Sequence, residues 1–576
     1  MNHCGEASLV LHLYGCYSSY VHLPGSQVVR NGGYDEYKNP ARRRLEQKNR
    51  WSGTLAVEVR MKISRRNLLR AAPLSVIPAL ADVPSHRWEG YDFGPGPAVT
   101  DRLNQGPFAI DQDEGWFTIA ATTPSDQRIR NWGLGLVGYT WEESGPSLAA
   151  RRGEETIEQH VEKLSSLPFV DVLYIRCDWR DVQSRAGKLD LHPIWKLTFD
   201  SARQRGLRVA FRVQLSNPEI QPAKIAMPDF LHDRVPLAKI GKLERHGREF
   251  DAIEPRYDHS EFQKAFRDLN ELLAAEFDSN PLVEYMDLMQ YGFWGEGHTS
   301  ALPNPFPDYV TAEKTFVAMT RLQLDTWKRT PLAVNTQPDI SNVGNREVID
   351  MAVRAGCWLR SDSILVEEPI QIEELTNRPA WLPVVMEDGS HRDYDVNTIP
   401  VDAAGINLRE NAMLHVLDLG ANYWSLWTEA GNLARYAERY PNGFRSLQQR
   451  MGYRVRPAWI WQRKRYGTAE VIAGFANNGV AGIPGVLRVT VESPDGKFRL
   501  CGSLDAGEPR AGKIRQASFV LPPQMDGQKL ILRGEIEGKA GIRHPIRWAC
   551  AQSLNPDGSM TVQLKSNADK DWRKGV

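Results

Sequence analysis

The chain has 576 residues but only six cysteines, and neither sign of charge predominates. The cysteines form no CxxC pair and no cysteine–histidine group at zinc-finger spacing, which argues against a thiol redox motif or a structural zinc site. Cys501 and Cys550 fall in one C-terminal region. The sequence does not decide whether they form a disulfide or remain two buried free thiols. Acidic and basic residues number 71 each, so the composition suggests neither a nucleic acid nor an anionic membrane as partner.

Motifs for nucleotide binding and for serine nucleophiles are missing as well. The sequence contains no phosphate-binding P-loop and no Gly-x-Ser-x-Gly nucleophile elbow. The run Gly133–Gly138 fits Gly-x-Gly-x-x-Gly, but no helix begins close behind it, so these glycines are expected to shape a strand. No cofactor or metal is expected, because a set of Glu296, His298, His391 and Asp393 lacks the usual histidine spacing of a metal site.

The apolar run that resembles part of a targeting signal is too short to cross a bilayer, because a membrane-spanning helix takes about 20 residues. It extends from Ala71 to Ala81, follows Arg65-Arg66 and Leu68-Leu69, and ends in Ala79-Leu80-Ala81. A basic start, an apolar stretch and a small-x-small site predict a cleaved signal peptide over residues 61–81, which resembles a twin-arginine export signal. We therefore expect a periplasmic or extracellular protein. A buried helix after a basic turn is the alternative.

Sixty residues precede this signal, although an export signal belongs at an N-terminus. They are rich in glycine, tyrosine, arginine and asparagine and show no sustained periodicity. We expect translation to begin at Met61, with residues 1–60 as a non-native or disordered extension. Residues 82–129 are then an N-terminal lead-in to the first domain.

From about residue 130, short apolar runs alternate with amphipathic helical segments. Strands are predicted at Trp132–Tyr139, Val170–Arg176, Arg208–Leu215, Val283–Tyr291, Leu332–Asn335, Cys357–Arg360, Leu382–Glu387 and Asn422–Trp427. Helices are predicted at Ile157–Leu167, Ile194–Gln204, Glu261–Phe277, Ala312–Trp327, Arg346–Ala355 and Leu408–Leu419. Eight strand–helix units predict an α/β fold, a closed parallel (β/α)8 TIM barrel over residues 130–450. Residues 216–260 are expected to be an active-site loop insertion.

After Met451 the pattern changes to alternating runs separated by Asn-Asn-Gly, Pro-Asp-Gly and Met-Asp-Gly turns. The runs are Ala469–Phe475, Leu487–Glu492, Ala517–Leu521 and Lys529–Glu535. This pattern predicts an antiparallel β-sandwich domain over residues 451–576 that begins near Gly452 and supplies no catalytic residue.

In such a barrel the reacting groups come from the C-terminal ends of the strands. The fourth predicted strand leads into Trp294-Gly295-Glu296-Gly297-His298, and the seventh ends in Met386-Glu387-Asp388. The fourth and seventh strands lie three steps apart in an eight-strand ring, so these carboxylates can face each other across its mouth. Two facing carboxylates suit the cleavage of a glycosidic bond, in which one donates a proton and the other attacks or stabilises the sugar carbon.

The region from Trp132 to Tyr440 resembles the clan A glycoside hydrolases, the superfamily that includes the family 42 β-galactosidases. The resemblance rests on the two glutamates, on Ile175-Arg176-Cys177-Asp178-Trp179 and on Tyr423-Trp424-Ser425-Leu426-Trp427. It implies that Glu296 is the acid/base with a raised pKa, that Glu387 is the ionised nucleophile, and that Arg176 keeps it ionised. The further substrate-binding candidates are Asp178, Trp179, Trp294, His298 and Trp427. The implied substrate is an oligo- or polysaccharide with a β-linkage, cleaved with retention by carboxyls about 5–5.5 Å apart.

The sequence also differs from that superfamily. Gly295 stands where an asparagine usually precedes the acid/base, and the tyrosine expected near the sixth strand is not seen around residues 358–364. Glu367, Glu368 and Glu429 are rival carboxylates. Each candidate could also have a purely structural role. Glu296 and Arg176 could be ion-pair residues, Glu387 could begin an Asp-Gly turn, and Trp427 could belong to the core. A carbohydrate-binding barrel without activity, or a metal-dependent hydrolase or lyase, are the alternative functions.

Overall fold

A computed structural model describes residues 114–141, 145–245, 247–300, 302–336, 342–362, 369–388, 408–465 and 468–566. The expected extension (1–60), the expected signal peptide (61–81) and most of the expected lead-in lie outside the described residues, as do the candidates Glu367, Glu368, His391 and Asp393. Within those ranges no helix is long and apolar enough to cross a membrane.

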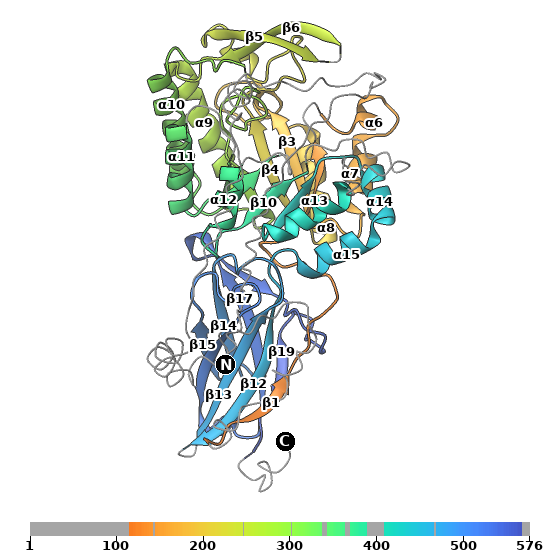
Figure 1. Ribbon diagram of the computed structural model, residues 1–576, viewed down its shortest axis with the longest axis vertical. Coiled ribbons are helices and arrows are strands. Elements are labelled where there is room, and N and C mark those ends of the chain that lie inside the picture. The colour runs from red at the N-terminus through yellow and green to blue at the C-terminus, as the bar shows by residue number, and fades with distance from the viewer. Residues whose placement is uncertain are drawn as a thin grey trace, which may run out of the picture. The chain divides into compact units, whose positions relative to one another are not determined.

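Eight parallel strands close into a barrel, which confirms the predicted fold class (Figure 1). In ring order they are β2 (Gly135–Trp141), β3 (Val172–Asp178), β4 (Arg208–Gln214), β7 (Val283–Asp287), β8 (Leu332–Asn335), β9 (Trp358–Ser361), β10 (Val384–Glu387) and β11 (Tyr423–Leu426). Each overlaps one predicted strand. The fourth strand ends at Asp287 and not at Tyr291 as expected.

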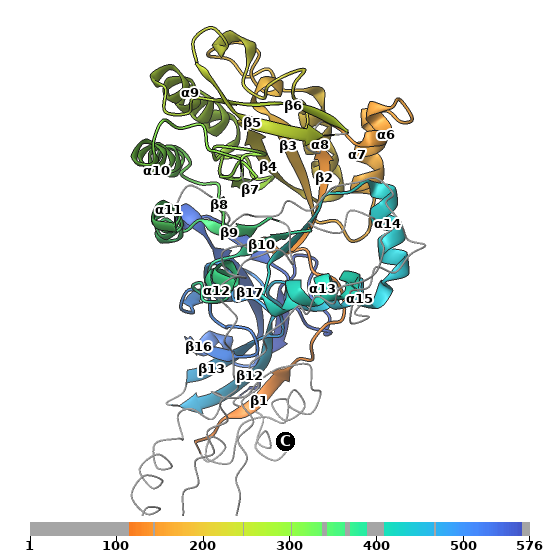
Figure 2. The same cartoon turned by 45° about the horizontal axis from the view of Figure 1, so that its top comes forward.

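Helices surround the barrel strands (Figure 2). They are α6 (Leu148–Arg151), α7 (Ile157–Ser165), α8 (Pro193–Arg205), α9 (Ser260–Phe277), α10 (Tyr309–Thr326), α11 (Asn342–Arg354), α12 (Pro369–Thr376), α13 (Leu408–Asp418), α14 (Ala430–Arg439) and α15 (Pro441–Arg450). Local signals set their ends: Thr156 and Gln159 form a capping box before α7, and Gly206 takes a left-handed φ of 64° after α8. Short 3-10 turns occupy Trp179–Asp181, Asp229–Leu231, Pro523–Met525 and Lys539–Gly541.

The predicted loop insertion after the third strand contains a β-hairpin. Its strands are β5 (Leu237–Arg245) and β6 (Arg248–Pro255), and Figures 1 and 2 both place it beyond one end of β3 and β4. Ile240, Leu243 and Phe250 of the hairpin share a small apolar cluster with Phe293. The hairpin therefore packs against the loop that carries Glu296.

Two antiparallel sheets follow the barrel. One has the order β1-β12-β13-β16, and the other has β15-β14-β17-β18 with β19 paired to β17. Their bounds are β1 (Phe117–Ala121), β12 (Val455–Arg465), β13 (Thr468–Asn477), β14 (Val486–Glu492), β15 (Arg499–Ser503), β16 (Ile514–Leu521), β17 (Lys529–Glu537), β18 (Arg543–Ile546) and β19 (Met560–Gln563). β1 comes from the expected lead-in, so the first sheet is not built from residues after 451 alone.

A single buried apolar cluster joins the barrel interior to both sheets. It includes Tyr174 and Tyr285 inside the barrel, Trp132 and Tyr453 at the junction, and Trp548 among the sheets. The second large cluster packs the outer faces of the barrel strands against the helices. Cys501 is exposed and Cys550 is buried, and both are free thiols, so the disulfide left open by the sequence does not form.

Candidate functional site

Three buried arginines lie on barrel strands, and they share several carboxylate partners. Arg176 on β3 pairs in register with Arg212 on β4, and Arg360 lies on β9. Because register neighbours in a parallel sheet project to the same side, Arg176 and Arg212 share one face inside the ring. Each guanidinium contacts at least two carboxyl groups described below. The barrel therefore holds a cationic cluster between its acidic residues.

Glu387 ends β10 and is held by three donors. Arg176 Nη1 lies 2.9 Å and the Tyr139 hydroxyl 2.8 Å from Oε1, while Arg360 Nη2 lies 2.7 Å from Oε2. Burial alone would raise the pKa of Glu387, but Arg360 and Arg176 outweigh it and keep this pKa well below the usual range. Arg176, which the resemblance places beside the nucleophile, is thus one of two arginines that favour the charged form of Glu387, and Arg360 is the larger contributor.

Glu296 lies on a tight loop after β7. The loop is closed by bonds from Phe293 N to His298 O (2.7 Å) and from Gly297 N to Tyr291 O (2.9 Å). Gly292 has a φ of 79°, and a Cβ there would lie 2.1 Å from His298 O. Only glycine fits this position, because both the left-handed backbone and the close carbonyl exclude a side chain.

The Glu296 carboxylate is engaged on both oxygens. Arg212 Nη1 and Arg176 Nη2 lie 2.9 and 3.3 Å from Oε1, and His298 Nε2 lies 3.2 Å from Oε2. Ser300 N donates to His298 Nδ1, which leaves the histidine proton on Nε2, facing Glu296.

These contacts overturn the expected pKa of Glu296. Burial raises it, but Arg176, the hydrogen bond from His298 and Arg212 together bring the pKa of Glu296 below its usual value. The expectation of a raised pKa was wrong, because the sequence did not reveal that Arg212 and Arg176 both reach this carboxylate.

A third carboxyl joins the two glutamates. Asp362 follows β9, and one oxygen each of Glu296, Asp362 and Glu387 lies within 4.8 Å of the others. Its Oδ1 accepts from Arg360 Nε at 2.8 Å and lies 3.7 Å from Arg212 Nη2. Burial and the charge of Glu296 raise the pKa of Asp362 well above its usual range, although Arg212 and Arg360 oppose them.

Asp287, the last residue of β7, completes the cluster. Its Oδ2 accepts a hydrogen bond from the Tyr174 hydroxyl and lies 3.4 Å from Arg212 Nη2 and 3.3 Å from Arg360 Nη1. Sequence reasoning missed Asp287, Asp362, Arg212 and Arg360. Polar residues inside or just after apolar strand runs were the signal: Arg212 within 208–214 and Arg360-Ser361-Asp362 after 357–359.

The remaining predicted site residues divide into two groups. His298 contacts Glu296, and Trp294 packs edge-on against His298 with ring centroids 5.9 Å apart. Trp427 is half-buried and its ring nitrogen donates to Asp388 O. Trp179 is fully buried in the core, where it bonds Gln183 and packs on Phe262, so we leave it out of the site.

Asp178 and Glu429 are explained by other contacts. Asp178 is buried, and its Oδ1 accepts from Gln214 Nε2 at 3.1 Å and from Asn217 Nδ2 at 2.9 Å. Burial, with a smaller contribution from Asp181, raises the pKa of Asp178 to about 8. Glu429 accepts from Ala149 N at 3.2 Å and precedes α14. Of the rival carboxylates, Glu429 is the one among the described residues, and its recorded partner lies outside the cluster.

The three clustered carboxylates have the composition of a metal site, but their surroundings do not fit one. Arg176 contacts both glutamates, and Arg360 contacts Glu387 and Asp362. A divalent cation among these oxygens would lie against buried guanidinium groups, whose charge repels it. The residues therefore suit a set of ion pairs rather than a metal centre.

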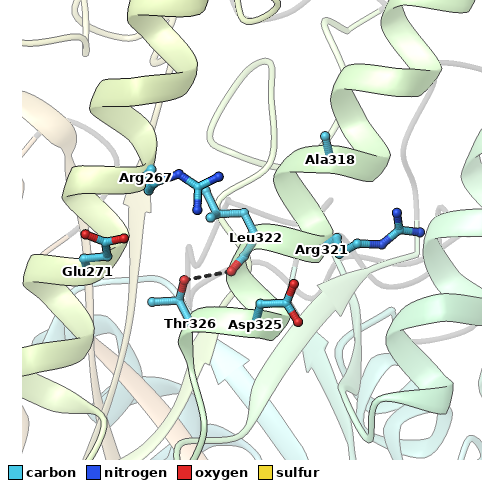
Figure 3. A pocket seen from close by; sticks show the side chains of 7 residues that line it. All are labelled: Arg267, Glu271, Ala318, Arg321, Leu322, Asp325 and Thr326. Atoms are coloured by element: carbon cyan, nitrogen blue, oxygen red, sulfur yellow. Dashed lines mark hydrogen bonds between the residues drawn. The ribbon is translucent and has the colours of Figure 1, made fainter.

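A surface hollow of about 470 Å³ lies between α9 and α10. Its lining is Arg267, Glu271, Ala318, Arg321, Leu322, Asp325 and Thr326 (Figure 3). The charged side chains in it are exposed, and Thr326 donates to the Leu322 carbonyl within its own helix. None of the carboxylates described above lines this hollow, so it is not part of the candidate site.

No family model and no curated protein sequence matches the chain. Among solved structures, it is similar to the catalytic domain of a β-amylase from Paenibacillus polymyxa, at 10% identity and a TM-score of 0.35 over 54% of this chain and 97% of that one. It is also similar to endo-glycoceramidase II from Rhodococcus sp., at 12% identity and a TM-score of 0.33 over 70% and 99%. A family 5 glycoside hydrolase from Prevotella bryantii gives 11% identity and a TM-score of 0.33 over 56% and 99%.

These structural neighbours are glycoside hydrolases, but the likeness is too weak to carry an argument about activity. The barrel is established by the strand pairing of this chain itself. A relation to family 42, and a family for the C-terminal sheets, remain hypotheses.

Proposed function

We propose that the protein is a glycoside hydrolase that cleaves a β-linked glycan with retention of configuration and uses Glu387 as its nucleophile. The observation that carries this proposal is the bridge formed by Arg176, whose two terminal nitrogens lie 2.9 Å from Glu387 and 3.3 Å from Glu296. The bridge brings two carboxylates from opposite parts of the ring together at the C-terminal ends of the strands, where TIM barrels carry out their chemistry.

The spacing and charges suit a retaining mechanism. One oxygen of Glu296 lies within 4.8 Å of one of Glu387, which is closer to the about 5–5.5 Å of retaining enzymes than to the roughly 6.5–9.5 Å of inverting ones. An ionised Glu387, held by Arg176, Arg360 and Tyr139, is prepared to attack the anomeric carbon. A second carboxyl of the cluster supplies the proton to the departing oxygen, and Glu296 occupies the position that the resemblance gives to this donor.

One observation favours a second candidate, a carbohydrate-binding barrel without activity. The carboxylates of Glu296 and Glu387 are both buried and both paired with arginine, as in a structural ion-pair cluster. The two functions differ in one measurable respect, since the binding barrel releases no aglycone.

The test is hydrolysis of a panel of nitrophenyl β-glycosides by the full chain and by Glu387→Ala. We expect release of nitrophenol from at least one sugar, and a loss of about 10⁴-fold or more in kcat for the variant. Glu429→Gln is the matched control, because this half-buried glutamate bonds Ala149 N and not the cluster, and it should keep its activity. No hydrolysis of any member, or equal rates for wild type and Glu387→Ala, would contradict the proposal and favour the binding barrel.

We also propose that the protein is exported through the signal at residues 61–81. The support is the Arg65-Arg66 pair, the apolar run after it and the Ala79-Leu80-Ala81 site. Changing Arg65 and Arg66 together to lysine should retain the protein in the cytoplasm. A mature N-terminus upstream of Met61, determined by mass spectrometry, would refute the proposal.

A further inference from the structure

Among the described residues, two carboxyls of the cluster, Asp362 and Asp287, each have one buried oxygen without a hydrogen-bond donor. The other oxygen of Asp287 accepts from the Tyr174 hydroxyl and lies close to both Arg212 and Arg360, so Asp287 is better compensated than Asp362. Asp362 Oδ1 is bonded by Arg360, but within the described ranges Asp362 Oδ2 is buried without a hydrogen-bond partner. An ionised carboxylate so placed loses the solvation of one oxygen, which costs free energy. A proton on Oδ2 removes this cost, because the carboxyl is then neutral and its O–H can act as a donor.

The charges of the cluster lead to the same conclusion. Three guanidinium groups, Arg176, Arg212 and Arg360, face four carboxyl groups, Glu296, Glu387, Asp287 and Asp362. Four ionised carboxyls would leave one excess negative charge buried in the barrel, whereas one neutral carboxyl balances the set. Glu296 and Glu387 each lie within 3.3 Å of two arginines. Asp287 lies within 3.4 Å of two arginines and also accepts from the Tyr174 hydroxyl. Asp362 lies that close to Arg360 alone, so its charge is the least compensated of the four.

We propose that Asp362, and not Glu296, carries the exchangeable proton of this site and donates it to the leaving group. The inference rests on the proposed glycosidase function and changes the assignment of one residue in it. The bond from Asp362 Oδ2 to its proton breaks as the departing glycosidic oxygen takes that proton. In the same step a Glu387 oxygen bonds to the anomeric carbon and the glycosidic C–O bond breaks.

The second step restores both groups. Water attacks the anomeric carbon of the glycosyl ester on Glu387, one water proton passes to the Asp362 carboxylate, and Glu387 leaves as a carboxylate. The two residues are coupled, because Glu387 loses the charge that attracts the Asp362 proton at the moment when it forms the ester. Glu296 stays ionised throughout as the partner of Arg212 and Arg176.

The titration directions agree with this division. The pKa of Asp362 is raised by burial and by Glu296, and the pKa of Glu387 is lowered chiefly by Arg360 and Arg176, with a smaller contribution from neighbouring Asp362. The charged groups facing Asp362 are Arg212 on β4, Arg360 on β9, Glu296 after β7 and Glu387 on β10. Activity should fall at high pH as Asp362 loses its proton and at low pH as Glu387 gains one.

The kinetic test compares Asp362→Asn with Glu296→Gln on aryl β-glycosides with good and poor leaving groups. For Asp362→Asn we expect kcat/KM to fall on the order of 10²–10⁴-fold for poor leaving groups and far less for dinitrophenyl glycosides, with loss of the high-pH limb. Glu296→Gln should lower the rates by a similar factor for all leaving groups and keep that limb. Dependence on the leaving group in Glu296→Gln, or in both variants, would contradict the proposal.

Failure of the glycosidase function is recognised separately, because then Glu387→Ala behaves as wild type. An infrared measurement tests the proton without any substrate. At neutral pH the carbonyl stretch of protonated carboxyls should be as strong in Glu296→Gln as in the wild type, and weaker in Asp362→Asn; buried Asp178, with its pKa of about 8, contributes equally to all three. If Asp362→Asn fails to fold, retention of the full band in Glu296→Gln still supports the proposal, and loss of part of it there contradicts it.

Discussion

At the scale of single residues, the site is a balance between buried charges. Arg360 shows this most clearly, since it is fully buried and contacts Asp287, Asp362 and Glu387. Buried ions of this kind are costly to desolvate, and the cost is met only while every partner is present. Removing a charged partner should therefore destabilise the protein, and removing a neutral one should not.

The two aspartates of the cluster allow a matched test. Asp287→Asn removes a carboxylate that lies 3.4 and 3.3 Å from Arg212 and Arg360, so we expect a loss of about 3–5 kcal/mol in the free energy of unfolding. Asp362→Asn replaces a neutral carboxyl with a neutral amide and should change it by about 1 kcal/mol or less. Urea unfolding at neutral pH measures both. Equal losses in the two variants would show that Asp362 is ionised.

Asp178 gives a pH-dependent prediction of known sign. Burial raises the pKa of Asp178 from 3.8 to about 8. The contribution of Asp178 to the free energy of unfolding is therefore fully present below pH 3.8 and is lost as the pH rises to about 8. Within that pH range, the free energy of unfolding falls by up to about 1.4 kcal/mol for each pH unit. Asp178→Asn keeps the acceptor for Gln214 and Asn217 but removes the titration.

We therefore expect Asp178→Asn to gain stability relative to the wild type between pH 5 and pH 8, as measured by urea unfolding at both values. A difference in the free energy of unfolding that is the same at the two pH values would show that Asp178 is ionised in the folded protein.

At the scale of elements, the loop from Gly292 to His298 packs with the β5–β6 hairpin, and together they position Glu296. Trp294 N donates to Ser216 O, and Gly292 N donates to the Tyr257 hydroxyl at 3.0 Å. The same hydroxyl donates to Glu254, a buried carboxyl whose pKa burial raises to about 7. The site thus depends on a segment that the sequence marked only as an insertion.

Gly292→Ala should disturb this loop. Its added Cβ would lie 2.1 Å from His298 O, so the loop must open, and we expect kcat to fall at least tenfold. Gly187→Ala is the control, because Gly187 has a similar φ of 73° with nothing within 4 Å of the added Cβ. Both variants carry the left-handed backbone penalty, but only the first has the clash. If both lose the same activity, the loop geometry does not position Glu296.

The sequence predicted the elements better than the contacts between them. All eight barrel strands were located because each is a short apolar run between turn or helix signals, as in Leu332–Asn335. Seven described strands outside the barrel were not predicted, namely β1, β5, β6, β12, β15, β18 and β19. β1 has only five residues, and no strong turn motif marks the hairpin of β5 and β6. Glu296, Glu387 and Arg176 do meet, but Asp362 and Arg360 were not identified, since a charged residue in a short strand does not reveal which partner faces it.

At the scale of the whole described chain, the barrel and the two sheets share buried contacts. Trp132 stacks on His544 with ring centroids 3.9 Å apart, the Tyr453 hydroxyl donates to Trp132 O at 2.6 Å, and Lys539 Nζ donates to Trp327 O at 2.8 Å. Burial lowers the pKa of His544 to about 4, so this stack is uncharged at neutral pH. The sheets therefore stabilise the end of the barrel.

Trp132→Ala should lower the free energy of unfolding by about 3–5 kcal/mol, because it leaves a cavity in the cluster shared by barrel and sheets. Calorimetry should show a single unfolding transition in the wild type. Two well-separated transitions in the wild type would contradict a shared core.

The central claim is that Glu387 is the nucleophile of a retaining glycosidase, and covalent labelling tests it most directly. The full chain is incubated with aryl 2-deoxy-2-fluoro-β-glycosides of several sugars, whose glycosyl esters hydrolyse slowly, and is then digested for mass spectrometry. We predict one added fluorosugar on the peptide that contains Glu387, and no label in Glu387→Ala. A label on Glu296 or on another residue, or hydrolysis of aryl glycosides with no covalent adduct, would contradict the account.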